Sequence, residues 1–283
     1  MDIRAIEKSK KLGYMFYITY NGTKFNAFDE LDGKITVKGT FKDIINKLGF
    51  TWAKGIQQAG RTDAKVSANE NILYVSSNYF GDLHKLMDEF NKNSDILKIT
   101  MIKKTFPNLV FPDMIARREY IYKYPQKKIK RKEDEIINLC KELSGKYDVS
   151  KFTDKKGQEL KNHIREVDIE FINGKLKFNG DSFMPKQVRI MSSYILTDSY
   201  EPLEGKYLTL NKIYLKDELK SKIFEEVSNI NIDYVEKIEK TLDETLYIFY
   251  TSKEKKGEVI GKNGKNIKSL KKQYGNIVVR EIW

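Results

Sequence analysis

The chain has 283 residues, of which 40% are hydrophobic and 12% aromatic, and it carries a formal net charge of +12. One cysteine, Cys140, excludes an internal disulfide, and the two distant histidines, His84 and His163, argue against a metal site or a Ser-His-Asp triad. Because no apolar run approaches the roughly 18 residues of a membrane span and no apolar signal segment is present, we expect a soluble, cytoplasmic, metal-free protein.

The first part of the chain is expected to interleave strands with amphipathic helices. Alternating aromatic and β-branched residues predict strands at residues 13–20, 71–77, 95–106 and 118–124. Apolar residues three and four positions apart predict helices at residues 40–50, with Thr40 as the N-cap, and 82–93.

The middle of the chain continues this mixture. We predict a helix at residues 130–145 ended by Gly145, a short helix at 182–196 and a strand at 205–215. Asn173-Gly174 divides residues 164–180 into two strands of a hairpin. Because the elements do not alternate regularly, the sequence favours an α+β domain over residues 1–215, with a mostly antiparallel sheet flanked by helices.

Residues 216–283 begin a different pattern, which we interpret as a second, smaller α/β domain. A helix is predicted at residues 216–229, and strands are predicted at 233–242 and 246–252. The final 33 residues hold eight Lys and one Arg against three Glu, so half of the net charge lies there. A general lysine bias would also make the chain basic, but this concentration favours a polyanionic partner for the segment.

The stretch VIGKNGKNIKSL, residues 259–270, contains Gly-x-x-Gly between two helical pieces. Glycines allow a tight turn and close approach of a sugar-phosphate backbone. Followed by a strand, the pattern resembles a KH domain, an RNA-binding module, and the order of elements resembles the prokaryotic-style arrangement. The alternative is a helix-turn-helix whose lysines are only solvated.

The KH resemblance implies a set of RNA contacts. The loop expected to clamp single-stranded RNA consists of Gly261, Lys262, Asn263 and Gly264. Further phosphate contacts are expected from Lys265, Lys268, Lys271 and Lys272.

The stretch GRTDAKVSA, residues 60–68, places Asp63 on a turn just before a strand. Taken alone, a turn with a surface salt bridge is the simpler interpretation. The stretch resembles, however, the Gly-Arg-Thr-Asp-x-Gly-Val-His-Ala signature of the tRNA pseudouridine synthase A family. Other pieces that resemble the family follow in its order, at residues 18–25, 116–124, 150–171, 180–191 and 201–215.

The resemblance implies an RNA pseudouridine synthase, an isomerase that detaches uracil from ribose and rejoins it through carbon without a cofactor. Asp63 is then the essential carboxylate, which attacks the sugar or removes its 2′ proton. Arg189 is its expected partner, since an arginine in an apolar stretch needs one, although a surface charge is the alternative. Tyr120 is expected to stack on the target base and could also relay a proton.

The expected partner is RNA, in the first place tRNA, with Arg61 and Arg165 as further contacts. Family members are often dimers, which leaves a homodimer open. Lys65 and Ser67 stand where the family has Gly and His, and residues 27–29, Ala-Phe-Asp, replace its Gly-Trp-Gln. The segment between residues 191 and 201 is also shorter than in the family.

Because of these departures, the uridine that would be modified in the RNA stays open. They also leave room for a second hypothesis. The chain could be a non-catalytic RNA-binding protein or RNA chaperone that retains the synthase fold. A nuclease tethered to a KH module has little support, because the sequence lacks paired carboxylates for metal ions.

Overall fold

The computed structural model describes residues 3–154 and 162–282. Its helices are α1 Ile3–Lys8, α2 Val37–Lys47, α3 Leu83–Lys92, α4 Glu133–Glu142, α5 Gln187–Thr197, α6 Lys256–Ile260 and α7 Lys265–Tyr274. Its strands are β1 Leu12–Tyr20, β2 Gln57–Gln58, β3 Ser67–Ser77, β4 Leu97–Thr105, β5 Ile115–Tyr122, β6 Gly145–Asp148, β7 Ile164–Ile172, β8 Lys175–Gly180, β9 Leu208–Leu215, β10 Ile223–Val227, β11 Lys237–Thr241, β12 Leu246–Thr251 and β13 Asn276–Glu281.

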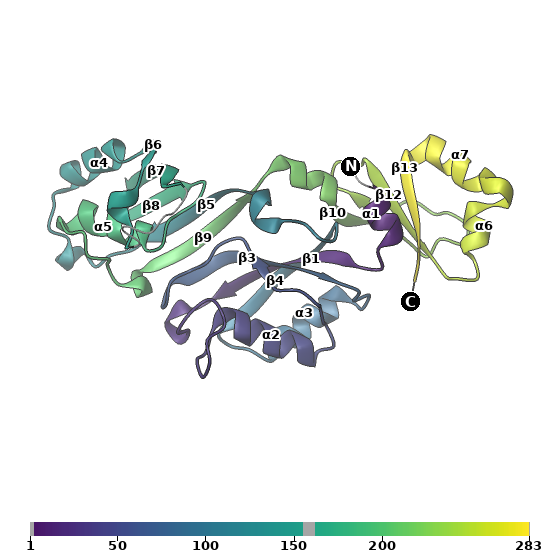
Figure 1. Cartoon of the computed structure of the whole chain (residues 1–283), viewed down its shortest axis with the longest axis horizontal. Helices are drawn as coiled ribbons and strands as arrows, with labels where there is room; N and C mark the ends of the chain where they lie inside the picture. The colour runs from purple at the N-terminus through teal and green to yellow at the C-terminus, as the bar shows by residue number, and fades with distance from the viewer. Residues whose placement is uncertain (1–2, 155–161, 283) are drawn as a thin grey trace.

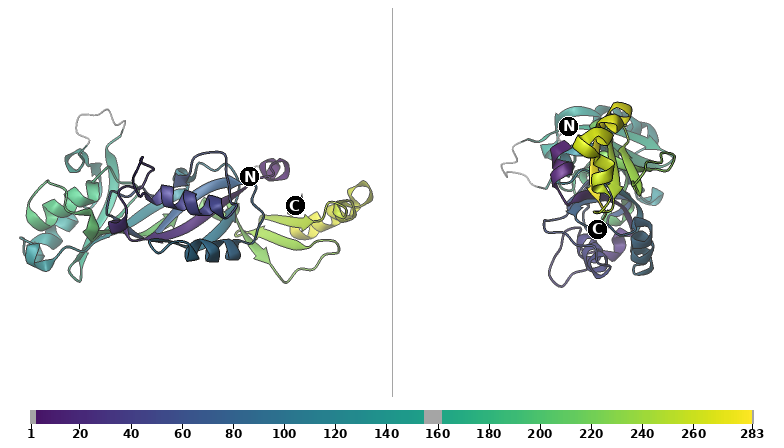
Figure 2. Two further views of the ribbon diagram at one scale, coloured as in Figure 1. Left: turned by 90° about the horizontal axis from the view of Figure 1, so that it is seen from below. Right: turned by 90° about the vertical axis from the view of Figure 1, so that its right-hand side faces the viewer.

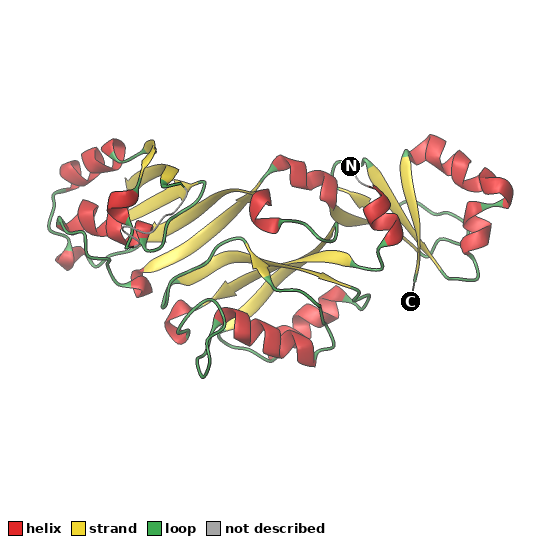
Figure 3. Cartoon of the chain, viewed as in Figure 1, coloured by secondary structure: helices red, strands yellow, loops and turns green. Residues whose placement is uncertain are grey.

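The strands form one long sheet, which gives the molecule an elongated shape that is narrow when seen end-on (Figures 1 and 2). Its order is β13-β12-β11-β10-β4-β1-β3-β9-β5-β8-β7-β6, with β2 beside β3. Among the described strands, only β3–β9 and β12–β13 pair in parallel. The fold is therefore a mixed α/β architecture, a large and mostly antiparallel sheet flanked by helices (Figure 3).

We name three groups along this sheet. The central strands are β1, β3 and β4, the distal strands are β5 to β9, and the C-terminal strands are β10 to β13. Helices α2 and α3 cover one face of the central strands (Figure 1). There Phe16 meets Phe41 edge-to-face at 5.1 Å and Phe41 lies 5.8 Å from Phe90, so aromatic contacts bind both helices to the sheet.

Several predicted boundaries are confirmed, and others are wrong. Asn173 and Gly174 have φ values of 51° and 71°, the positive pair that a two-residue hairpin turn requires. Thr40 is not an N-cap, because α2 begins three residues earlier and Thr36 Oγ1 accepts the Gly39 N–H. Gly145 does not end the preceding helix either, since α4 stops at Glu142 and Gly145 begins β6.

The helix predicted at residues 216–229 is also wrong. Asp217–Lys222 forms a short 3-10 helix, and Ile223–Val227 is strand β10. The open edge of β4 offers hydrogen bonds to this segment, and the Phe224 ring stacks on Phe106 at 5.4 Å. Pairing at a sheet edge therefore overrides a local helical pattern, and the helix expected before the KH-like core is replaced by a strand.

The main core continues into the C-terminal strands. Along β12, Leu246, Ile248 and Tyr250 point into the main core. Phe249 instead points to the opposite face, where a second cluster lies beneath Ile267 of α7. This period of two shows that β12 is buried on both faces. The division into domains at residue 215 stays a prediction, since both sheet and core cross it.

A buried ion pair lies at the junction between the central and C-terminal strands. Glu239 of β11 is 3% exposed, and its Oε1 lies 2.7 Å from the Lys104 Nζ of β4. The Tyr250 hydroxyl donates to Oε2 at 2.7 Å. Burial alone would raise the pKa of Glu239, but Lys104 and the Tyr250 hydrogen bond outweigh burial and lower it.

We expect Glu239→Leu to lower the free energy of unfolding by about 3 kcal/mol, because it leaves the Lys104 ammonium buried without its partner. The double variant Lys104→Met, Glu239→Leu should recover part of this loss, because the unpaired Lys104 charge is removed while the Tyr250 hydroxyl still lacks its acceptor. Urea unfolding of the single and double variants measures both effects. A double variant no more stable than the single would place the cost in packing instead of in the unpaired charge.

Candidate active site

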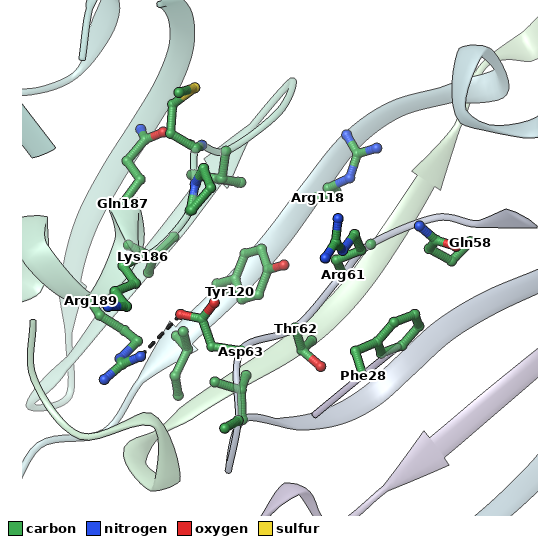
Figure 4. Close-up of a pocket in the computed structure, with 18 of the residues that line it drawn as sticks. Phe28, Gln58, Arg61, Thr62, Asp63, Arg118, Tyr120, Lys186, Gln187 and Arg189 are labelled. Atoms are coloured by element: carbon green, nitrogen blue, oxygen red, sulfur yellow. Dashed lines mark hydrogen bonds and ion pairs between the residues drawn. The ribbon is translucent and has the colours of Figure 1, made fainter. Parts of the chain in front are cut away.

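A pocket of about 720 Å³ opens where the central strands meet the distal strands (Figure 4). This junction is short, since β3 pairs with β9 through two residue pairs, Ser67 with Thr209 and Ala68 with Leu210. One wall comes from residues 26–31 and 58–66, and the other comes from residues 182–189 with β5. The volume falls in the range of small-molecule sites, so the pocket can accept one nucleoside.

Asp63 and Arg189 meet across this pocket. Asp63 lies on the turn between β2 and β3, and Arg189 lies in the first turn of α5. Arg189 Nη1 donates to Asp63 Oδ2 at 3.1 Å, and its Nε donates to the Leu203 carbonyl at 2.6 Å. The guanidinium is thereby fixed by the backbone and orients the carboxylate (Figure 4).

Buried polar contacts hold the segment that leads to Asp63. The Asn71 side chain, fully buried in β3, accepts the Gly60 N–H at 3.2 Å and donates to the Gly60 carbonyl at 2.8 Å. The hydroxyls of Tyr20 and Thr62 lie 2.8 Å apart. Each partner is buried, so loss of either contact would leave a polar group unsatisfied. The backbone before Asp63 is therefore fixed to the central strands.

Tyr120 lines the same pocket from β5. The residue is 6% exposed, and its ring meets Phe183 edge-to-face at 5.3 Å. Burial raises the pKa of Tyr120 well above its usual value; Tyr20 and Asp63 add to the increase, and Arg118 opposes it. The phenol therefore stays protonated at neutral pH and can donate a hydrogen bond, but it releases its proton less readily than an ordinary tyrosine.

Arg118 is a pocket residue that the sequence analysis did not select. Its Nε donates to the Ala59 carbonyl at 2.7 Å, and its Nη1 donates to the Asp181 carbonyl. From β5 it therefore ties both walls of the pocket together. Burial lowers its pKa from the usual value of arginine. The only signal in the sequence was the place of Arg118 in the family-like piece at residues 116–124, and it gave no indication of this role.

Arg61 lies at the mouth of the pocket and is 71% exposed. Its Nε lies 2.8 Å from Asp29 Oδ2, and Lys38 Nζ lies 2.8 Å from the other oxygen of Asp29. Arg61 is therefore held at the rim with most of its surface open to a ligand.

Arg165 lies on β7 outside the pocket lining. Its Nη1 donates to the carbonyls of Asn162 and Ile164, and its Nε is buried without a hydrogen-bond partner among the described residues. An RNA contact by Arg165 stays a prediction. Residues 155–161, within a family-like piece of the sequence, lie outside the described residues.

The predicted RNA-binding loop lies between α6 and α7, far from the pocket along the sheet (Figure 1). Gly261 and Gly264 have φ values of 75° and 71°, which favour glycine. The lysines of the loop and of α7 are exposed, and none forms an ion pair with a described residue: Lys262, Lys265, Lys268, Lys271 and Lys272. Asn263, also exposed, completes the loop.

Within residues 3–154 and 162–282, no group of three or more His, Cys, Asp or Glu side chains could hold a metal ion. No helix in those ranges is both long and apolar enough to cross a bilayer. The pocket thus offers the carboxylate of Asp63 oriented by Arg189, the phenol of Tyr120 and two further arginines, Arg61 and Arg118, a set suited to acid–base or nucleophilic chemistry.

Comparison with known proteins adds to this geometry. No family model matches the chain. The tRNA pseudouridine synthase A of Picrophilus torridus is 24% identical over 197 residues, covering 66% of this chain and 72% of the relative. That of Streptococcus equi subsp. equi is 28% identical over 210 residues, covering 65% and 82%. The chain is homologous to these proteins over about two thirds of its length.

The relatives support an isomerase, an RNA pseudouridine synthase. Among solved structures, the crystal structure of a Cbf5-Nop10-Gar1 complex matches with a TM-score of 0.34 and 14% identity, covering 72% of this chain and 51% of that chain.

The departures from the synthase pattern keep the turn in place by other means. Lys65 occupies the position of the family glycine with a φ of 68°, and the Val66 N–H closes the turn by donating to the Asp63 carbonyl at 3.2 Å. Ser67, at the position of the family histidine, accepts the Gly22 N–H at 3.0 Å. These hydrogen bonds hold the turn in this conformation, but a lysine in the left-handed region is strained.

We expect Lys65→Gly to stabilise the protein. Relief of the left-handed strain, about 1–2 kcal/mol, exceeds the entropy cost of glycine, about 0.5–1 kcal/mol. The gain should raise Tm by about 2 °C in a thermal unfolding experiment. Lys65→Ala is the control, since it keeps Cβ and the strain while losing the hydrogen bond of Nζ to the Thr23 carbonyl. An equal gain in Lys65→Ala would contradict a backbone origin.

Proposed function

We propose that this chain isomerises uridine to pseudouridine in RNA, with tRNA as the first candidate substrate and Asp63 as the catalytic carboxylate. The supporting observation is the state of that carboxylate. Arg189 holds Oδ2 at 3.1 Å, while Oδ1 accepts no hydrogen bond from the described residues. The Asp63 side chain is 33% exposed in the pocket, so its free oxygen can reach a bound sugar.

The proposed reaction breaks the bond between N1 of uracil and C1′ of ribose, turns the base, and joins C5 to C1′. The proton on C5 leaves last. No atom is gained and no electrons pass to a second molecule, so the chemistry requires no cofactor. Asp63 Oδ1 would either add to C1′ or take the 2′ proton, and both routes need the unoccupied oxygen and the fixed position that Arg189 provides.

The pocket wall suits a base that has been turned out of an RNA stack. The Tyr120 ring offers an aromatic surface beside Asp63, and such a surface tolerates rotation of the uracil. Because its phenol stays protonated, Tyr120 is assigned to stacking and hydrogen-bond donation and not to removal of the C5 proton. Arg61 at the mouth is the proposed contact to the RNA backbone around the target.

A second RNA contact is proposed at the loop Gly261–Gly264. Its support is the positive φ of both glycines together with the exposed, unpaired lysines of the loop and α7. The parallel pair β12–β13, joined through α6, this loop and α7, agrees with a KH-like core, although the preceding helix is absent. Such a surface binds a sugar-phosphate backbone more readily than a protein partner.

Asp63→Asn is expected to reduce pseudouridine formation at least ~1,000-fold, because the amide cannot act as a nucleophile or base. RNA affinity should change less than threefold. Tritium release from tRNA labelled at uridine C5 measures turnover, and a filter-binding assay measures affinity. The control is Asp198→Asn, another aspartate paired with an arginine, Arg131, but outside the pocket lining.

Full activity of Asp63→Asn would refute the assignment of the carboxylate. No tritium release by the unaltered protein from any cellular RNA, with RNA binding retained, would favour the alternative of a non-catalytic RNA-binding protein or chaperone.

The double variant Lys262→Asp, Asn263→Asp is expected to weaken RNA binding at least about tenfold at 0.15 M salt, and to reduce the salt dependence of binding. It adds negative charge at exposed positions and keeps both glycines in place. Asn46→Asp, Lys47→Asp makes the same charge change at exposed positions of α2 and should have little effect. Equal weakening by the two variants would show that only total charge matters.

A further inference from the structure

The loop between α6 and α7 is joined to the rest of the molecule without a flexible linker. Lys216 alone separates β9 from the 3-10 helix Asp217–Lys222, and β10 begins directly after that helix. The Lys216 N–H donates to the Met114 carbonyl at 2.9 Å, and Leu219 is 1% exposed. The Phe106 N–H donates to the Lys222 carbonyl at 2.9 Å. Each step of the connection is therefore fixed to the main body, by which we mean residues 3–215 as far as the structure describes them.

The far end of the C-terminal strands is fixed as well. Arg280 of β13 is 7% exposed, and its guanidinium donates to the carbonyls of Ile6 at 3.3 Å and Lys10 at 3.1 Å. The same guanidinium lies 5.7 Å from the centre of the Phe80 ring. Together with the buried pair of Lys104 and Glu239, these contacts connect the C-terminal strands to three separate segments of the main body.

The two proposed RNA contacts therefore have a constant separation. Arg189 lies on α5 near one end of the long axis, and α6 and α7 lie at the other end (Figure 1). Tethered modules adopt many relative positions, whereas modules that share a sheet and a hydrophobic core do not. An RNA that occupies both contacts must match the separation that the protein sets.

We propose that the protein selects RNAs in which the target uridine and an unpaired segment are separated by a set distance along the molecule. This inference rests on the proposed synthase function. The substrate class is a folded RNA extended enough to follow the long axis, with the uridine in the pocket and unpaired nucleotides on the loop at Gly261–Gly264. Two contacts made at once raise affinity by orders of magnitude, and the gain is lost when geometry forbids one of them.

A series of synthetic RNAs tests the proposal. Each carries one uridine in a hairpin loop and an unpaired tail, joined by a duplex whose length increases in single base pairs. Short duplexes are stiff, so length sets the separation. For the unaltered protein, kcat/KM for pseudouridine formation should peak at one length and fall at least tenfold a few base pairs to either side.

The variant Lys262→Asp, Asn263→Asp should show no such peak, because it removes the second contact. The control variant Asn46→Asp, Lys47→Asp should keep the peak. A flat profile for the unaltered protein, with the hairpin still modified, would overturn the fixed-distance proposal and leave the synthase function standing. No pseudouridine in any RNA of the series, nor in total tRNA, would overturn both.

Discussion

The site depends on the short junction between β3 and β9, which we call the seam. Here two residue pairs join the central strands to the distal strands. Asp63 comes from one side of the seam and Arg189 from the other, so their 3.1 Å contact exists only while the seam stays closed. Arg118 closes it further, because it donates to carbonyls on both sides. A carboxylate positioned in this way loses little entropy when a ligand binds, which is what a preorganised site requires.

Local patterns predicted much of this arrangement. The strands around residues 13–20, 71–77 and 164–180 follow from alternation, and the turn at Asn173 follows from its two residues. The family-like pieces also selected Asp63, Tyr120 and Arg189, which the structure brings to one pocket. Their catalytic roles stay a prediction.

Features that depend on distant partners were not predictable. The sequence of residues 216–229 does not indicate that the edge of β4 is open for pairing. The helical pattern of these residues was therefore misleading. Arg118 looks like any basic strand residue until Ala59 and Asp181 are seen beside it. The sequence around Glu239 gives no sign that this glutamate is buried. In the structure it is buried and pairs with Lys104, which lies 135 residues earlier. Such contacts are set by tertiary structure, and a single sequence carries no record of them.

The departures from the family pattern include Ala27, Phe28 and Asp29, which line the pocket, and residues of the turn that carries Asp63. Asp29 holds Arg61, Lys65 Nζ reaches the Thr23 carbonyl, and Ser67 accepts the Gly22 N–H. Each replacement joins residues 60–67 to residues 22–29, so the turn keeps its place while its outer surface changes. In the proposed function this surface faces the RNA, so the choice of RNA would change there without moving the carboxylate. The connection of the C-terminal strands likewise places the proposed RNA contact at Gly261–Gly264 far from the pocket (Figure 1).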